Sequence, residues 1–229
     1  MVLTHKIICG DCIEIMKEME SDSVDLVLTD PPYNVGKDFG NESDKQGEKQ
    51  YLSMILSVSS EVKRILRWGG LSFWFFSIKH LPVIFRQFQD WNYLWTLCWI
   101  AKNKRSMSVF GYNLWQPILC FGKSGKSKWL KNQDVYYATT GQEKYNHPTP
   151  KPLKLIMDLI KDFSVENDTI LDPFLGSGTT SVAAERLGRN SIGIEISKEY
   201  CEIAYKRLLN EVRQAKLNRE SSVIERVGF

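Results

Sequence analysis

Two short apolar runs in this sequence each end on an aspartate, and they constrain the fold more than any other feature. Residues 24–30 read Val-Asp-Leu-Val-Leu-Thr-Asp, and residues 168–172 read Asp-Thr-Ile-Leu-Asp. Nearly continuous apolar runs of this length are typical of strands buried on both faces of a parallel sheet. Each run therefore predicts a buried strand that delivers a carboxylate, that of Asp30 or Asp172, to the carboxyl edge of the sheet.

Strand and helix patterns alternate along the rest of the chain. Further strands are predicted at 6–9, 71–76, 94–99, 117–121 and 191–195, and helical periodicity runs through 12–19, 50–67, 153–163, 179–187 and 198–212. Such alternation indicates a mostly parallel, doubly wound α/β sheet. We expect one domain over residues 1–213, with a mobile loop at 35–49 and an inserted region at about 101–146. The tail at 214–229 loses its periodicity and is expected to fray or to pack on a partner.

The composition is that of an ordinary globular protein, with 229 residues of which 43% are apolar and 25% are charged. A net charge of +3 is too small to indicate a nucleic-acid or membrane partner by itself. The apolar stretches are far below membrane-spanning length and no signal segment is evident, so we expect a soluble, cytoplasmic protein with no membrane partner. The five cysteines are an odd number, which argues against a disulfide framework.

A glycine-containing loop follows the second of the two aspartate strands. Gly176-Ser177-Gly178 lies directly before a helix predicted to begin at Thr179, and glycines there let backbone N–H groups approach a ligand closely. The third glycine of a dinucleotide fingerprint is absent, and no Lys-Ser/Thr pair follows as in a phosphate-binding loop. Glu195 ends the next strand, 19 residues after Gly176, where an acid can accept hydrogen bonds from ribose hydroxyls. The loop therefore favours a ribose over a pyrophosphate, with a plain tight turn as the alternative.

The first aspartate strand continues into Asp30-Pro31-Pro32-Tyr33. Two prolines fix the backbone and present carbonyl oxygens without N–H donors, so the corner is a rigid array of acceptors beside an aromatic face. A planar ligand with an exocyclic amine suits this array. The structural alternative is a Pro-Pro turn with a capping aspartate and a core tyrosine.

Together the two motifs give the sequence a specific resemblance. It resembles the β-class, S-adenosylmethionine-dependent DNA amino-methyltransferases, in which the Asp-Pro-Pro-Tyr motif precedes the recognition region and the glycine loop follows it. Gly10-Asp11-Cys12, Gly193-Ile194-Glu195 and the segment from His147 to Pro152 are similar to further family landmarks, although Pro150 stands where the family commonly has glutamine. The resemblance spans residues 5–209 and implies a Rossmann-like methyltransferase fold with a circularly permuted motif order.

The resemblance also implies roles for individual residues. The catalytic corner would be Asp30, Pro31, Pro32 and Tyr33, with the target base flipped out of the duplex and stacked on Tyr33. S-adenosylmethionine, which is converted to S-adenosylhomocysteine, would be the cofactor, and no metal is implied. Its binding residues would be Asp11, Cys12, Asp30, His147, Thr149, Lys151, Asp172, Phe174, Gly176, Ser177, Gly178, Thr179, Glu195 and Ile196. Cys9-x-x-Cys12 near His5 lacks the second ligand pair that a zinc site needs.

Positive charge is concentrated between the two motifs. Residues 101–131 contain no acidic residue, whereas the remaining residues have a net charge of −4. Because the family carries its recognition region here, we predict a surface that follows the phosphates of double-stranded DNA rather than a merely solvated face. The predicted contacts are Lys102, Lys104, Arg105, Lys123, Lys126, Lys128 and Lys131. The tryptophans Trp91, Trp95, Trp99 and Trp115 are predicted to pack on the sheet rather than to read DNA.

These features predict an enzyme that methylates adenine N6 in double-stranded DNA by direct transfer. Methylation of cytosine N4 is the close alternative, although enzymes of that type more often carry serine where Asp30 stands. RNA as substrate, a non-catalytic DNA-binding module and a Rossmann-type oxidoreductase are the others. The target sequence, a partner restriction endonuclease and a homodimer are not specified by the sequence.

Overall fold

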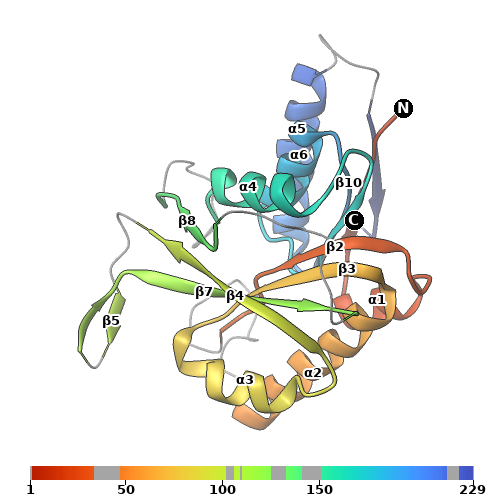
Figure 1. Cartoon of the computed structure of the whole chain (residues 1–229). Coiled ribbons are helices and arrows are strands. Elements are labelled where there is room, and N and C mark those ends of the chain that lie inside the picture. The colour runs from red at the N-terminus through yellow and green to blue at the C-terminus, as the bar shows by residue number, and fades with distance from the viewer. Residues whose placement is uncertain are drawn as a thin grey trace.

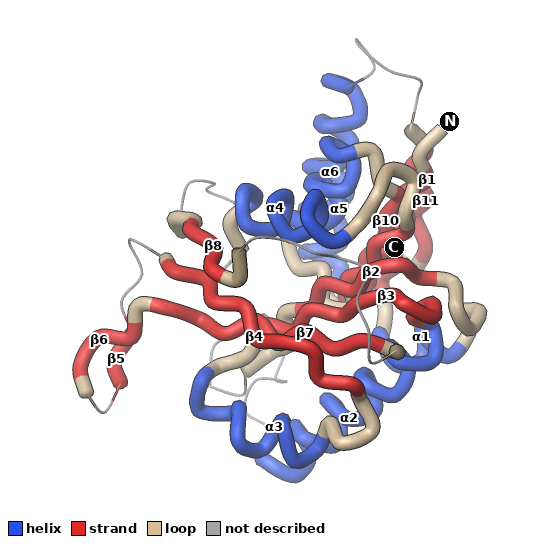
Figure 2. Tube along the Cα trace, in the orientation of Figure 1, coloured by secondary structure: helices blue, strands red, loops and turns tan. Residues whose placement is uncertain are grey.

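The computed structural model describes residues 2–33, 47–101, 106–108, 110–124, 133–140, 151–215 and 222–228. Figure 1 and Figure 2 show a central twisted sheet with helices on both faces. The helices are α1 (Cys12–Lys17), α2 (Glu48–Ile65), the 3₁₀ helix η2 (Ile78–His80), α3 (Leu81–Gln87), α4 (Leu153–Phe163), α5 (Thr179–Leu187) and α6 (Lys198–Ala215). The strands are β1 (Thr4–Cys9), β2 (Val24–Thr29), β3 (Leu66–Phe75), β4 (Asn92–Ile100), β5 (Ser106–Ser108), β6 (Gly111–Asn113), β7 (Trp115–Gly122), β8 (Val135–Tyr137), β9 (Thr169–Asp172), β10 (Asn190–Glu195) and β11 (Val223–Val227).

Among the described residues the main sheet has nine strands in the order β11-β1-β10-β9-β2-β3-β7-β4-β8. All neighbouring strands pair in parallel except β7, which is antiparallel to both β3 and β4. A short hairpin of β5 and β6 stands outside this sheet. The predicted class, a mostly parallel doubly wound α/β fold, is therefore confirmed.

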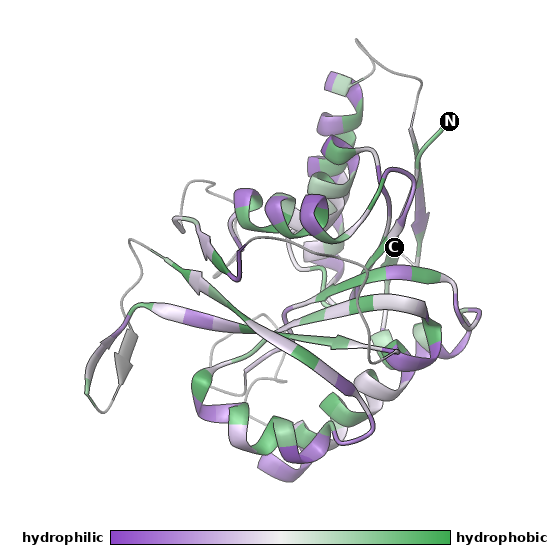
Figure 3. Ribbon diagram, in the orientation of Figure 1, coloured by the Kyte–Doolittle hydropathy of each residue, from purple (hydrophilic) through white to green (hydrophobic). Residues whose placement is uncertain are grey.

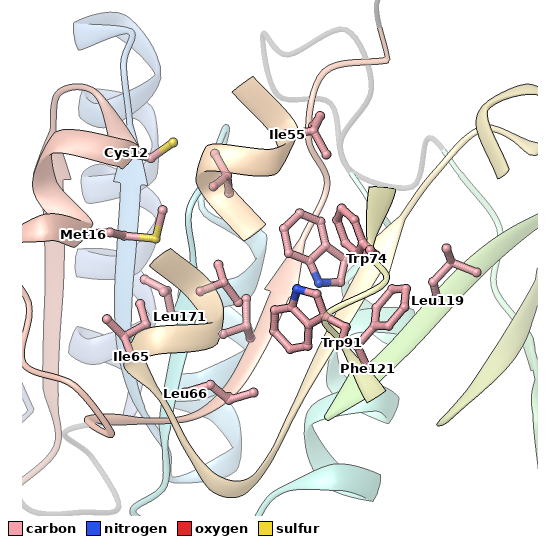
Figure 4. Packing of buried hydrophobic residues seen from close by; sticks show 14 of the residues in the cluster. Cys12, Met16, Ile55, Ile65, Leu66, Trp74, Trp91, Leu119, Phe121 and Leu171 are labelled. Atoms are coloured by element: carbon pink, nitrogen blue, oxygen red, sulfur yellow. The ribbon is translucent and has the colours of Figure 1, made fainter. Parts of the chain in front are cut away.

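Two hydrophobic layers hold the helices on the sheet. One face packs against α1, α2 and α3, and Figure 4 shows part of this layer, with Trp74, Trp91 and Phe121 gathered beside Ile55. On the other face, Leu26, Phe73 and Ile170 pack with α4 and α5, and α6 covers β1. Figure 3 shows green and purple residues alternating around the helices, as expected of amphipathic helices that cover a sheet.

The strand register aligns the carboxyl ends of the parallel strands. Cys9 lies opposite Glu195, and Gly193 lies opposite Asp172. The backbone N–H of Gly10 donates to the carbonyl of Glu195 at 2.9 Å, which ties the ends of β1 and β10 together. The residues that follow β1, β2, β9 and β10 therefore meet along one edge, as is usual for binding sites in open α/β sheets.

Three regions differ from the sequence-based expectations. The tail contributes β11, which pairs in parallel with β1, so the prediction of a fraying tail is wrong for Val223–Val227. Within the region predicted as an insert at 101–146, β7 is an interior strand of the sheet, so that region is not one contiguous insert. The helix α3 and its leading turn η2 were not predicted. Of the predicted loop at 35–49, residues 35–46 lie outside the described residues, and α2 already begins at Glu48.

None of the helices in the described ranges is long and apolar enough to cross a membrane.

Candidate active site

A cavity of about 430 Å³ opens at the carboxyl edge of the sheet. Both aspartate strands end in it, because Asp30 follows β2 and Asp172 closes β9. Glu195 from β10, Lys151 before α4 and Gln116 from β7 line the same space. Elements that are far apart in the sequence therefore present three carboxylates, an ammonium and an amide to one cavity.

The glycine loop forms the turn from β9 into α5. Gly176 and Gly178 have φ values of +54° and +85°, in the left-handed region that disfavours other residues. Gly178 also meets α6 closely, since a Cβ at this position would lie 2.8 Å from the Cβ of Ala204. Both backbone conformation and space require glycine at Gly178, so the second glycine of the motif brings α6 against the loop.

A buried arginine supports this loop from behind. Arg207 on α6 donates from Nη1 to the carbonyl of Ser177 at 2.6 Å, to the hydroxyl of Ser177 at 2.9 Å and to that of Thr179 at 3.3 Å. Its side chain is only 7% exposed. Arg207 was not predicted from the sequence, because an arginine within an amphipathic helix gives no local signal that it is buried.

Glu195 is fixed by backbone donors of two neighbouring loops. Its Oε2 accepts from the Gly176 N–H and its Oε1 from the Ser197 N–H, both at 2.9 Å. Burial raises the pKa of this carboxyl, and the backbone hydrogen bonds oppose that effect. Each carboxylate oxygen can accept a further hydrogen bond, so Glu195 can also hold the hydroxyls of a ribose in the cavity.

Asp172 is the most strongly perturbed acid of the cavity. Burial raises its pKa from 3.8 to about 7, against the hydrogen bonds that it accepts from the Thr180 hydroxyl at 2.6 Å and the Phe174 N–H at 3.1 Å. The charges of Asp30 and Glu195 contribute to this raised pKa. A buried carboxyl held in this way favours a cationic ligand, which would stabilise its ionised form.

The Asp30 corner is a network of side chains. The hydroxyl of Tyr33 donates to Oδ1 of Asp30, and the amide Nε2 of Gln116 donates to the same hydroxyl at 2.5 Å. Burial and the neighbouring Asp30 raise the pKa of Tyr33 well above its ordinary value, so the phenol stays protonated and remains a donor. Gln116 thereby fixes the orientation of the Tyr33 hydroxyl across the cavity.

Lys151 also belongs to this corner in the structure. Its ammonium donates to Oδ2 of Asp30 and lies 3.4 Å from the hydroxyl oxygen of Tyr33. The sequence-based prediction placed Lys151 at the cofactor instead. In the structure its polar contacts are with the predicted catalytic residues.

At the end of β1, Asp11 and Cys12 begin α1. The carboxylate of Asp11 caps the helix by accepting from the N–H groups of Ile13 at 2.8 Å and Glu14 at 3.2 Å. Burial, assisted by the charge of Asp11, raises the pKa of the Cys12 thiol to about 12, so it is not a nucleophile at neutral pH. Asp11 and Cys12 both line the cavity, but the hydrogen bonds of Asp11 serve to cap α1.

Most of the predicted site residues that the structure describes line this one cavity. They are Asp11, Cys12, Asp30, Pro31, Pro32, Tyr33, Lys151, Asp172, Phe174, Gly176, Ser177, Thr179, Glu195 and Ile196. Gly178 lies in the loop between two of them. His147 and Thr149 fall outside the described residues. Among the residues that are described, no group of His, Cys, Asp and Glu could hold a metal ion.

The predicted DNA contacts are mostly untested by the structure. Lys102, Lys104, Arg105, Lys126, Lys128 and Lys131 lie outside the described residues. Lys123 follows β7 at the opposite, amino edge of the sheet, where its ammonium donates to Asp22 at 2.6 Å and to the carbonyls of Leu66 and Arg64 at 3.0 and 3.1 Å. This placement counts against Lys123 as a phosphate contact beside the cavity.

The four tryptophans divide into two pairs. Trp91 and Trp99 are buried, as predicted. Trp95 and Trp115 are 57% and 40% exposed, so for them the prediction of packing fails in part. Trp115 lines the cavity mouth together with Leu114. An apolar aromatic surface therefore borders the candidate site.

Glu195 and the glycine loop line one cavity together with the Asp30–Tyr33 corner, at the carboxyl edge of a mostly parallel α/β sheet. Residues 24–206 match the family model N6_N4_Mtase, described as DNA methylase. The chain therefore belongs to the N6/N4 DNA methylase family, and the resemblance drawn from its motifs is confirmed.

Individual relatives agree with this membership. The type II methyltransferase M.HpaI of Haemophilus parainfluenzae is 29% identical over 239 residues, which cover 91% of this chain and 76% of M.HpaI. The DNA adenine methyltransferase YhdJ of Escherichia coli is 28% identical, over 88% of this chain and 82% of YhdJ.

Solved structures share the fold. The PvuII DNA methyltransferase, which is cytosine-N4-specific, has a TM-score of 0.77 at 19% sequence identity. The aligned part covers 98% of this chain and 96% of the PvuII chain. The M1.HpyAVI–SAM complex has a TM-score of 0.69 at 28% identity and covers 89% of this chain and 98% of its own.

Proposed function

We propose that this DNA amino-methyltransferase methylates N6 of adenine in double-stranded DNA, with S-adenosylmethionine as the methyl donor. One observation carries the proposal: the Asp30–Tyr33 corner and the Glu195–glycine-loop side line the same cavity. The relative YhdJ, named as an adenine methyltransferase, supports adenine as the target. Methylation of cytosine N4 is the second candidate, because the PvuII enzyme of the same fold has that specificity.

The residues present fit the cofactor. Glu195 offers carboxylate oxygens for the ribose hydroxyls, and the backbone of the glycine loop allows a close approach of the ligand. The carboxyl of Asp172 suits a cationic group in the buried part of the site. When bound, S-adenosylmethionine supplies a methyl group on a positively charged sulfur.

Asp30 would act on the target amine. The lone pair of an adenine amino group is delocalised into the ring, which makes the nitrogen a poor nucleophile. The Asp30 carboxylate and the Pro31 carbonyl would accept its two hydrogens, which favours a pyramidal and more nucleophilic nitrogen. Asp30 also offers an acceptor for the proton that the nitrogen loses after methylation. Tyr33 would stack on the flipped base.

The DNA surface remains a proposal based on sequence. We propose that Lys102, Lys104, Arg105, Lys126, Lys128 and Lys131 contact phosphates, because the cluster lies between the two motifs. The exposed Trp115 at the cavity mouth adds an aromatic surface for bases. A cognate restriction endonuclease is proposed as a partner, because M.HpaI is named a type II methyltransferase.

The decisive experiment is an assay of the product. The protein is incubated with genomic DNA and labelled S-adenosylmethionine, and the digested nucleosides are separated by chromatography. We expect label in N6-methyl-2′-deoxyadenosine only, and sequencing then locates the modified site. Label in N4-methyl-2′-deoxycytidine would replace the proposal with the second candidate, and label only in an RNA control would overturn DNA as the substrate.

A further inference from the structure

The ammonium of Lys151 occupies a confined position in the Asp30 corner. It donates to Oδ2 of Asp30 and lies 5.5 Å from the ring centre of Tyr33 and 5.1 Å from that of Phe75. The Lys151 side chain is only 10% exposed, and that of Asp30 is 27% exposed. A cation thus lies against a carboxylate and two aromatic faces, within the wall of the cavity.

The same position is the one that the target amine requires. In the proposed function, a flipped base stacks on Tyr33 and donates an exocyclic N–H to Asp30. Lys151 already supplies a nitrogen donor to Asp30 beside the Tyr33 ring. The other carboxylate oxygen of Asp30 accepts from the Tyr33 hydroxyl, which Gln116 holds in turn. Each Asp30 oxygen could accept a second hydrogen bond, but the ammonium lies beside the Tyr33 ring, so a base that stacks on this ring must displace it to donate to Asp30.

We propose that Lys151 is a positioning residue that holds the place of the target amine in the empty site and leaves Asp30 when the flipped base enters. This inference rests on the proposed function. It also explains why the prediction of a cofactor role for Lys151 does not match its contacts. The hydroxyl oxygen of Tyr33, 3.4 Å from the ammonium, is an acceptor within reach of the displaced lysine.

The exchange has a consequence for base selection. A half-buried carboxylate that loses its cationic partner is costly, and Lys151 keeps Asp30 paired until the base arrives. Adenine or cytosine can replace the ammonium because each carries an amine. A base with a carbonyl oxygen at that position, such as thymine, would set lone pairs against the carboxylate. Asp30 therefore makes the displacement of Lys151 conditional on an amine.

Binding measurements with Lys151→Met test this exchange. Two duplexes carry the mapped target site: in one the target base is mispaired, and in the other that position is abasic. The dissociation constant of the abasic duplex divided by that of the mispaired duplex reports the contribution of the base. Near pH 8, we expect Lys151→Met to raise this ratio about tenfold, because the competing donor is gone and Asp30 is left for the amine. Lys151→Arg keeps a competing cation and should not raise it.

Controls separate the exchange from other roles of Lys151. Lys154→Met removes an exposed lysine of α4 that pairs with Asp158, and it should leave the ratio unchanged. An unchanged or lower ratio in Lys151→Met, with a normal melting temperature, would overturn the inference. If Lys151→Met does not fold, Lys151→Leu, which also lacks a donor, serves in the same comparison. A tenfold loss of S-adenosylmethionine affinity in Lys151→Met with no rise in the ratio would instead support the cofactor-binding role predicted from the sequence.

The assay also distinguishes this inference from the proposed function. If the wild-type protein methylates no base in DNA, the proposed function and the exchange fail together. If it methylates DNA but the ratio does not rise in Lys151→Met, only the exchange fails.

Discussion

The two edges of the sheet use the same residue types in opposite ways. At the carboxyl edge, Lys151 and Asp30 pair in the wall of a cavity. At the amino edge, the ammonium of Lys123 donates to Asp22 and to two backbone carbonyls near the end of α2. Arg64 donates there to the carbonyls of Met16 and Met19. Lys123 and Arg64 at the amino edge are held by backbone carbonyls, whereas Lys151 and Asp30 at the carboxyl edge pair with each other in a cavity that can take a ligand. The edge on which a charged residue lies thus predicts its role better than its sequence motif alone.

The largest expected effect separates two aspartates that flank the same strand. Asp30→Ala should reduce turnover by about 10²- to 10³-fold, because a preorganised acceptor for the reacting amine is lost, while DNA binding is kept. Asp25→Asn is the matched control. Asp25 lies near the amino end of β2, where it accepts from Arg67 and from the Thr169 N–H, so its turnover should stay near that of the wild type.

Single-turnover kinetics and a DNA-binding titration of both variants make this comparison. Full methylation by Asp30→Ala would remove the corner from the mechanism. A large loss of turnover in Asp25→Asn would contradict the prediction that only the aspartate at the carboxyl edge contributes to turnover.

The second prediction concerns stability and pH at Asp172. Its pKa of about 7 in the folded state exceeds the ordinary value of 3.8, so the folded protein keeps a proton that the unfolded chain releases. The stability that this group contributes is present below about pH 4 and is lost as the pH rises through about 7. Asp172→Asn should therefore stabilise the protein by up to about 4 kcal/mol at pH 8 and leave it nearly unchanged near pH 4.

Denaturant unfolding at several pH values measures this difference. Asp168→Asn, at the amino end of the same strand, serves as the control because Asp168 caps the turn at Val165 and should show no gain at high pH. Equal effects of the two substitutions would mean that burial of Asp172 does not set the pH dependence.

The smallest effect distinguishes Lys123 from its neighbours in sequence. The sequence alone predicts that neutralising Lys123, Lys126 or Lys128 each lowers the slope of log affinity against log salt by about 1. In the structure Lys123 is bound within the protein, so Lys123→Gln should leave the slope unchanged and cost about 1 kcal/mol of stability. Salt titrations of DNA binding and thermal melting check both. A lower slope in Lys123→Gln would restore it as a phosphate contact.

Local patterns were sufficient for much of the fold. The bounds of α4 and α5 agree with the periodicity, and every predicted strand is present, because apolar runs and helical faces are encoded within short windows. The short helix α3 and the strand β11 were missed. Every residue of β11 except Ile224 is exposed, and Ile224 is half-buried, so β11 lacks the apolar signal of a buried strand.

The site could be predicted where its residues form motifs. Asp30, Tyr33, Asp172 and Glu195 lie at strand ends, and strand ends can be read from the sequence. Gln116 and Arg207 could not be found in this way, because each acts on a residue that is distant along the chain: 83 positions to Tyr33 and 30 to Ser177. The contacts of Lys151 were missed for the same reason, since Asp30 is 121 positions away.

The position of β1 has a consequence for how the chain folds. Its partners are β10 and β11, and His5 bonds to Ser191 across 186 positions. During synthesis β1 is made long before either partner, so both of its hydrogen-bonding edges stay unpaired until nearly the whole chain has emerged. Such long-range pairing slows folding and leaves an aggregation-prone strand exposed. We therefore expect refolding to be limited by the capture of β1, and truncations that remove β10 and β11 to be insoluble.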